Sequence, residues 1–249
     1  MSITSDLAIA AAGFGAGMVN TIVGSGSLIT FPTLLSLGYS PLVANVSNTL
    51  GLVPGSISGA IGYRKELEGQ RQRAIKLSVF ALLGGVVGAL LLVTYPGAFQ
   101  QIVPYLIIAA VVLMALQPRI SKALSSRDKS HITSGLIYGG VFLTAIYGGY
   151  FGAAQGVVLI ALLAIGIDDS LQRLNALKNV LAGLVNGIAA IFFIIVTHVA
   201  YTPALLIAIS SVIGAQVGAK VGRKIPQKVL RAIVVIVGLG VAISLLAKG

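Results

Sequence analysis

Long, continuous runs of apolar residues alternate with short polar stretches along the chain. The runs cover residues 6–23, 28–38, 42–63, 74–94 and 99–117, and then 132–151, 152–167, 174–197, 201–222 and 226–247. Most of them approach the roughly 20 residues that a helix needs to cross the hydrocarbon core of a bilayer. They lack the alternating polarity of strands in an outer-membrane barrel. The pattern therefore predicts an all-α polytopic membrane protein with about eight to ten membrane segments, discontinuous helices included.

Composition supports this class and narrows the expected partners. Of the 249 residues, 57% are hydrophobic and 9% are charged, whereas soluble domains average about 25% charged residues. The net charge of +11 comes mostly from Lys and Arg in short loops, which is typical of cytoplasmic loops rather than of a nucleic-acid surface. Cysteine is absent, which excludes disulfides and thiolate chemistry. We expect the lipid bilayer and a small anionic substrate as partners, with no nucleic acid and no cofactor, and we leave homo-oligomer formation open.

The two halves of the chain resemble each other. LGGVVGA at 83–89 recurs as IGAQVGA at 213–219, and the same spacing relates Asn45 to Asn175. LSLGYS at 35–40 similarly corresponds to LAIGID at 163–168. We therefore expect a first membrane repeat over residues 1–117, a cytoplasmic linker over 118–131 and a second membrane repeat over 132–249.

Loop charges predict how the two halves are oriented. The loop at 64–76 is basic, while its counterpart at 197–202 has no Lys or Arg. Conversely, the turn at 95–98 is uncharged, while its counterpart at 220–231 is basic. Because basic loops remain in the cytoplasm, equivalent loops should lie on opposite sides of the membrane. This predicts an inverted-topology repeat in the inner membrane, with both termini outside, which is the construction of many secondary transporters. A passive channel of the same symmetry is the alternative.

Each half contains a short apolar run next to a glycine-rich stretch. GSGS at 24–27 precedes the first, and GGYFG at 148–152 leads into the second. Such segments at corresponding positions are typical of discontinuous helices at a transporter binding site, although a plain loop between two ordinary helices gives the same pattern. A helix that begins inside the membrane presents unpaired N–H groups and a positive dipole end, which suit an anion.

Polar side chains near these stretches and on the helices that follow are the candidate substrate ligands. Positions 175, 178, 179 and 186 share one helical face, and positions 45, 48 and 49 repeat that spacing. The candidates are Asn20, Ser25, Ser27, Asn45, Asn48, Thr49, Gln155, Asn175, Lys178 and Asn179. For any one Asn, hydrogen bonding between helices is the alternative role.

Lys178 indicates the charge of the substrate. A buried ammonium group is costly unless it is paired. Apart from Asp6 at the start of the first run, no acidic residue lies within a predicted span, so an anionic substrate is the expected counter-charge. Alternatively, Lys178 extends to the cytoplasmic surface. The same absence of acidic residues argues against a proton relay. A membrane-embedded enzyme is not indicated, since the chain has no HExxH or GxSxG pattern and no cluster of His and acidic residues.

Three stretches carry a resemblance to a known family. They are GFGAGMVNTIVGSGSLITFPTLLSLGYSPLVANVSNT in the first half, and GGYFGAAQGVVLIALLAIGI and LNALKNVLAGLVNGIAA in the second. They resemble the sulfite exporter TauE/SafE family over essentially the whole chain, and Lys178 matches its motif Lys. Ala154-Gln155 stands where the family usually has Gly, and the usual consecutive glycines around Ser25 are missing. The resemblance implies an exporter of small sulfur-containing anions such as sulfite, thiosulfate or organosulfonates; a passive anion channel and a non-transporting membrane scaffold are the alternatives.

Overall fold

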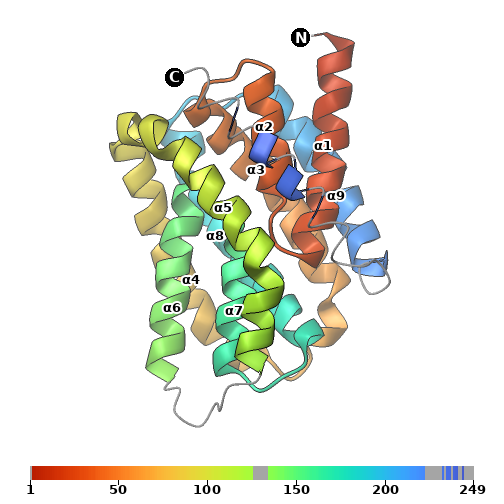
Figure 1. Ribbon diagram of the computed structural model, residues 1–249, viewed down its shortest axis with the longest axis vertical. Helices are drawn as coiled ribbons and strands as arrows, with labels where there is room; N and C mark the ends of the chain where they lie inside the picture. The colour runs from red at the N-terminus through yellow and green to blue at the C-terminus, as the bar shows by residue number, and fades with distance from the viewer. Residues whose placement is uncertain are drawn as a thin grey trace.

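The computed structural model describes residues 2–125 and 134–221, together with residues 232, 234–236, 238–240 and 243. The run expected at 226–247 and the end of the expected linker therefore lie largely outside the described residues. The elements are α1 (Ile3–Ile22), α2 (Ser27–Ser36), α3 (Pro41–Gly62), the short 3₁₀ helix η1 (Arg64–Leu67), α4 (Arg71–Thr94), α5 (Pro96–Ser125), α6 (Ser134–Tyr150), α7 (Gln155–Gly166), α8 (Leu171–Val196) and α9 (Tyr201–Val221) (Figure 1).

The predicted all-α class is confirmed. Each apolar run predicted before residue 222 forms a helix, and the described residues form no strand. Four of these helices are long and apolar enough to cross a bilayer by themselves: α4, α5 as far as Ile120, α8 and α9. Large apolar side chains also cover the outside of the molecule, such as Leu83 at 54% and Ile209 at 59% exposure. Lipid contact explains such a surface, and the chain is a multi-pass membrane protein.

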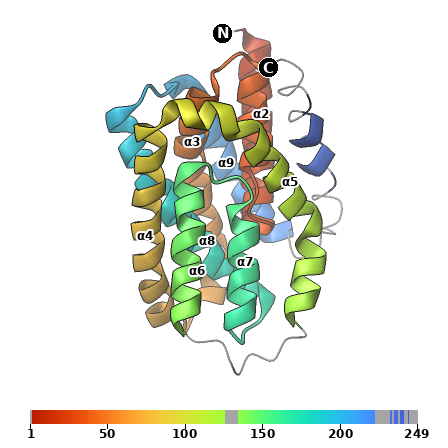
Figure 2. The ribbon, with the colours of Figure 1, turned by 60° about the vertical axis from the view of Figure 1, so that its left-hand side comes forward.

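The long helices stand side by side in the order α1, α9, α3, α8, α4 and α6. α3 and α8 are antiparallel. Ala200, after the end of α8, donates to Ser47 near the start of α3. At the other end, Gln70, beyond the end of α3, donates to the carbonyl of Arg173 at the start of α8. α1 and α6, at the two ends of the row, also run in opposite directions (Figure 1). α5 runs diagonally across the molecule and contacts both α2 and α7 (Figure 2).

The glycines that recur in the two halves make matching helix contacts. Gly84 and Gly88 of α4 lie against the backbone of α6, and Gly214 and Gly218 of α9 lie against the backbone of α1. A Cβ atom at any of the four would overlap backbone atoms of the neighbouring helix. Small residues at these positions therefore allow the close approach that stabilises helix pairs in membranes.

The two short helices do not extend through a bilayer. α2 has 10 residues and α7 has 12, so they are about 15 and 18 Å long, against a hydrocarbon core of roughly 30 Å. α1 and α2 form one hairpin and α6 and α7 form another, each with its connection inside the molecule (Figures 1 and 2). One boundary differs from expectation: α5 continues to Ser125, so the first part of the predicted linker is helical.

Candidate functional site

The connections inside the two hairpins lie next to each other. We call residues 23–26 the first break and residues 151–154 the second break. Gly24 and Gly152 have φ angles of +90° and +76°, in the left-handed region that favours glycine. The N–H of Gly156, in the first turn of α7, donates to the carbonyl of Gly24 at 3.0 Å. A Cβ on Gly24 would lie 2.5 Å from the Cα of Gly156, so this contact requires glycine.

The first residues of the two short helices occupy equivalent positions in the two halves of the sequence. Ser27 starts α2 and Gln155 starts α7, one residue before and three residues after the starts of the predicted runs. The two residues are 128 positions apart, as are the matching blocks at 35–40 and 163–168. Among the described residues, the N–H groups of Ser25, Gly26 and Ser27 donate to no backbone carbonyl, as expected at a helix N-terminus. The Ser25 hydroxyl is buried and donates to the sulfur of Met114 on α5 at 3.4 Å. The start of α2 therefore offers backbone donors inside the protein.

The polar face of α8 holds the C-terminal end of α1. Lys178 Nζ donates to the carbonyls of Asn20 at 2.9 Å and Thr21 at 3.5 Å. The side-chain amides of Asn175 and Asn179 donate to the same Thr21 carbonyl, at 3.1 and 3.3 Å. The carbonyls in the last turn of a helix have no intrahelical partner, so three side chains of α8 satisfy those of the interrupted helix α1.

Lys178 is fully buried, with 0% exposure, so the alternative in which it extends to the surface is wrong. Its side chain passes the first break, since a Cβ on Gly24 would lie 3.2 Å from Lys178 Cδ. Its acceptors are neutral carbonyls at the negative end of the α1 dipole. No carboxylate among the described residues forms an ion pair with it. An ammonium group has three N–H donors, and the two carbonyls accept hydrogen bonds from two of them.

The polar face of α3 contacts the hairpins in a related way. Asn45 donates to the carbonyl of Tyr150, the last residue of α6, at 3.0 Å. Asn48 donates to the hydroxyl of Ser27 at 3.1 Å and so contacts the start of α2. Thr49 is buried next to it. Asn45 therefore contacts the hairpin of the second half, whereas its sequence counterpart Asn175 contacts the hairpin of the first.

Three of the predicted residues carry a buried polar atom without a hydrogen-bond partner among the described residues. They are the carbonyl oxygens of the Asn45 and Asn175 side chains and the amide nitrogen of Gln155. The Gln155 side chain is 2% exposed and packs against Gly148, which has no room for a Cβ atom. Leaving such atoms unpaired costs about 1–3 kcal/mol each. A bound ligand or water would therefore find unused hydrogen-bonding groups on both sides of the breaks.

Two residues of this cluster were not predicted from the sequence. The Ser56 hydroxyl accepts from the side chain of Asn20 at 3.3 Å, and Thr30 of α2 donates to Asn48. The repeat contains a signal for Ser56, because Ser56 and Asn186 are as far apart in sequence as Asn45 and Asn175. Asn186 lies near the second break, with its Oδ1 3.8 Å from where a Cβ on Gly152 would be. Thr30 had no such signal.

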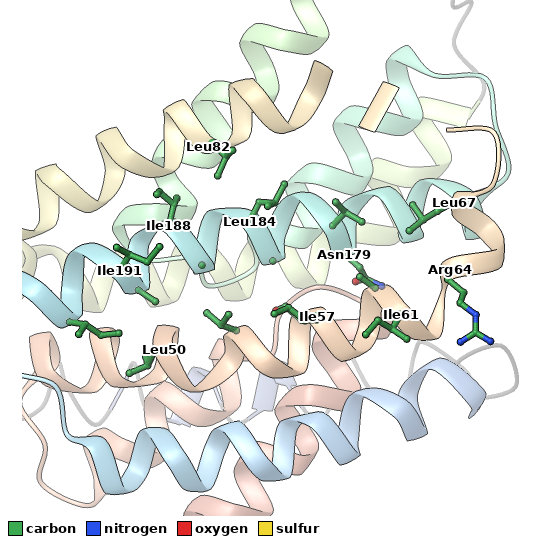
Figure 3. A pocket seen from close by; sticks show the side chains of 18 residues that line it. Leu50, Ile57, Ile61, Arg64, Leu67, Leu82, Asn179, Leu184, Ile188 and Ile191 are labelled. Atoms are coloured by element: carbon green, nitrogen blue, oxygen red, sulfur yellow. The ribbon is translucent and has the colours of Figure 1, made fainter. Parts of the chain in front are cut away.

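One edge of the cluster opens onto a groove between α3 and α8. Ser56 and Asn179 line this groove, which has a volume of about 750 Å³ and otherwise almost entirely apolar walls (Figure 3). Gly183 and Gly187 of α8 lie along it, and a Cβ on Gly187 would meet nothing within 4 Å. The groove therefore exists partly because α8 has no side chains at these positions.

An ion-pair cluster joins the starts of α4 and α8, apart from the breaks. Asp169 accepts from Arg73 at 3.1 Å and from Arg173 at 2.8 Å. Burial by itself raises the pKa of Asp169, but hydrogen bonds from Arg173, the Ser170 N–H and Arg73 outweigh it and lower that pKa. Asp169 therefore stays ionised at neutral pH and holds the two helices together rather than carrying a proton.

A multi-pass helical bundle in which two interrupted helices meet at a buried polar cluster is typical of membrane transporters. The chain belongs to the Sulfite exporter TauE/SafE family, whose family model matches residues 9–245. Family membership indicates a transporter with a small-molecule substrate rather than an enzyme.

Similar proteins from three bacteria have related descriptions. The chain is 28% identical over 234 residues to the "Probable membrane transporter protein YfcA" of Escherichia coli (strain K12), covering 93% of this chain and 86% of that protein. A "Probable membrane transporter protein" of Haemophilus influenzae is 26% identical over 231 residues, covering 90% and 88%. The "Probable membrane transporter protein ORF9" of Sinorhizobium sp. is 28% identical over 244 residues, covering 95% and 90%. No solved structure matches.

Proposed function

We propose that the protein exports a small sulfur-containing anion, such as sulfite, thiosulfate or an organosulfonate, across the cytoplasmic membrane. The substrate would bind at the two breaks, next to Lys178. The family description supports a sulfur oxyanion, and the chemistry of the site supports an anion.

The observation that carries the proposal is the fully buried ammonium group of Lys178. It has two carbonyl acceptors and no carboxylate partner among the described residues. A buried cation with incomplete compensation favours an anion that brings the missing charge. The N–H groups at the start of α2 and the unpaired amide of Gln155 would add donors to the oxyanion. The carbonyl oxygens left free on Asn45 and Asn175 suit a protonated oxyanion or a bridging water.

The packing supports two equivalent halves of opposite orientation. α1 packs on α9 as α6 packs on α4, and α3 and α8 meet in the middle of the row. Asn45 and Asn175 each bind the last turn of the other half's interrupted helix. We therefore retain the repeats at 1–117 and 132–249 and the linker at 118–131. We also retain the orientation in the inner membrane, in which the basic loops are cytoplasmic and both termini lie outside.

A carrier fits the closed geometry better than an open channel of the same symmetry. Lys178 is inaccessible, and the first break and the start of α7 are joined by the Gly156–Gly24 hydrogen bond. An anion can reach Lys178 only after these segments separate. In an alternating-access cycle, they would separate toward one side of the membrane and then toward the other.

Flux into proteoliposomes tests this function. Radiolabelled sulfite and a labelled alkylsulfonate would be presented to vesicles that contain the wild-type protein or Lys178→Met. The exposed Lys76 of α4 provides a matched control as Lys76→Met. We expect saturable uptake that shows counterflow, is lost in Lys178→Met and is retained in Lys76→Met. Flux without saturation or counterflow would favour the channel, and absence of flux from a fully helical protein would favour the scaffold.

A further inference from the structure

We propose that the groove between α3 and α8 binds an anionic phospholipid, with an acyl chain along its apolar walls and the phosphate next to Arg64. The groove meets the polar cluster at Ser56 and Asn179, whereas its apolar walls and Arg64 lie beyond the proposed substrate ligands. Lipid binding in the groove does not depend on which anion is transported.

The apolar part of the groove has the properties of an acyl-chain site. Its volume is about 750 Å³, which is within the usual range for small-molecule pockets. Ile57 and Ile61 of α3 and Ile191 and Ile194 of α8 line it and are between 44% and 54% exposed, so the groove opens toward lipid. In Figure 3 the labelled apolar side chains of α3 and α8 follow the groove, and Arg64 stands at one end.

At that end the groove continues into a basic pocket. The two share Ile61 and Arg64, and the basic pocket has a volume of about 420 Å³. It is also lined by Lys65, Glu66 and Lys220, so among the described residues three cations stand against one carboxylate. Basic pockets between membrane helices are typical binding sites for acidic lipid headgroups.

Gln216 completes the polar lining, and its amide is already used. Its Nε2 donates to the carbonyl and the hydroxyl of Ser58, at 2.9 and 2.8 Å. Within the part of the chain that the structure describes, the positive charge available to a ligand therefore comes from Arg64, Lys65 and Lys220, which are all exposed at the surface. A free anion would use only this pocket and leave the apolar groove empty. A single anionic phospholipid complements both parts at once.

The absence of Trp from the chain allows a direct test. Ile191→Trp places a single fluorophore on the groove wall, and Leu143→Trp places one on the exposed face of α6, where Leu143 is 66% exposed. Each protein would be reconstituted with phosphatidylglycerol or phosphatidylcholine carrying brominated acyl chains, which quench Trp on contact. We expect Ile191→Trp to show a preference for phosphatidylglycerol at least about five-fold greater than that of Leu143→Trp.

Two further variants assign that preference to the groove and to its cations. The preference should disappear when Arg64, Lys65 and Lys220 are all replaced by Gln, and persist in Lys76→Gln. It should also disappear in Gly187→Phe, which fills the groove. It should persist in Gly139→Phe on α6, where a Cβ likewise meets nothing within 4 Å.

Three results would overturn the proposal. Equal quenching by the two lipids would show that the charge of the headgroup does not matter. Quenching of Leu143→Trp but not of Ile191→Trp would show that another copy of the chain covers the groove. A preference that survives the triple Gln variant would place the headgroup elsewhere.

Discussion

Lys178 of α8 donates a hydrogen bond to the backbone carbonyl of Asn20 in the last turn of α1, at 2.9 Å. The donor and the acceptor belong to different halves of the chain. The end of the interrupted helix in the first half is thus held by a cation of the second half. Any movement that separates the halves must also break this bond, which links the site to the conformational change that transport requires.

The contact between the two breaks should be sensitive to a single methyl group. Gly156→Ala places a Cβ 2.4 Å from the Cα of Gly24, so the backbone of the first break or of the start of α7 must move. We expect the free energy of unfolding to fall by about 1–3 kcal/mol. Thermal unfolding in detergent measures this, with Gly139→Ala as the control in open space. Equal melting temperatures for the two variants would contradict the close packing.

Asn45 and Asn175 should differ in importance although they are sequence counterparts. Asn45→Ala removes the amide that donates to the Tyr150 carbonyl. After Asn175→Ala, by contrast, the Thr21 carbonyl still accepts hydrogen bonds from Asn179 and Lys178. We expect Asn45→Ala to destabilise the protein by about 1 kcal/mol and Asn175→Ala by less. Denaturation of the two variants side by side measures the difference; a larger loss for Asn175→Ala would be inconsistent with these hydrogen bonds.

Gln155 should separate stability from function. Its amide nitrogen is buried without a partner among the described residues, so removing the polar group relieves an unfavourable burial. We expect Gln155→Leu to fold at least as stably as the wild type while anion flux falls by about ten-fold or more, equivalent to one lost hydrogen bond to a charged group. Melting temperature and proteoliposome flux on the same preparation measure both. A variant that transports normally would remove Gln155 from the site.

The Asp169 cluster predicts how stability changes in acid. Burial opposes the shift, but hydrogen bonds from Arg173, Ser170 and Arg73 hold the folded-state pKa of Asp169 below its ordinary value of 3.8. Its contribution to stability is therefore fully present well above pH 3.8 and is lost as the pH falls through the lower folded-state pKa. Asp169→Asn should lower the melting temperature at pH 7. The difference in melting temperature between this variant and the wild type should become smaller as the pH approaches 3. A difference that does not change with pH would argue against the ion pairs.

Much of this arrangement could be predicted because it follows from local patterns. The lengths of the apolar runs predicted the helices, including the short α2 and α7. The run predicted at 28–38 begins within one residue of α2, whereas the run predicted at 152–167 begins three residues before α7. These properties depend on spacing along the chain and on glycines at corresponding positions.

The partners of Lys178 could not be predicted in the same way. They are main-chain carbonyls, freed because α1 ends inside the protein, and any residue type supplies a carbonyl. The crossed pairing of Asn45 and Asn175 also depends on which helices pack together. Neither the orientation in the membrane nor the identity of the anion follows from these contacts, and both stay predictions.

Binding of an anion to Lys178 variants tests the central claim most directly. Isothermal titration of purified wild type, Lys178→Met and Lys76→Met with sulfite and an alkylsulfonate would give the affinities, and circular dichroism would verify helicity. We expect wild type and Lys76→Met to bind alike, and Lys178→Met to bind about 30-fold more weakly or not at all. Unchanged affinity in a folded Lys178→Met protein would contradict the account and leave Lys178 as a structural cap on α1.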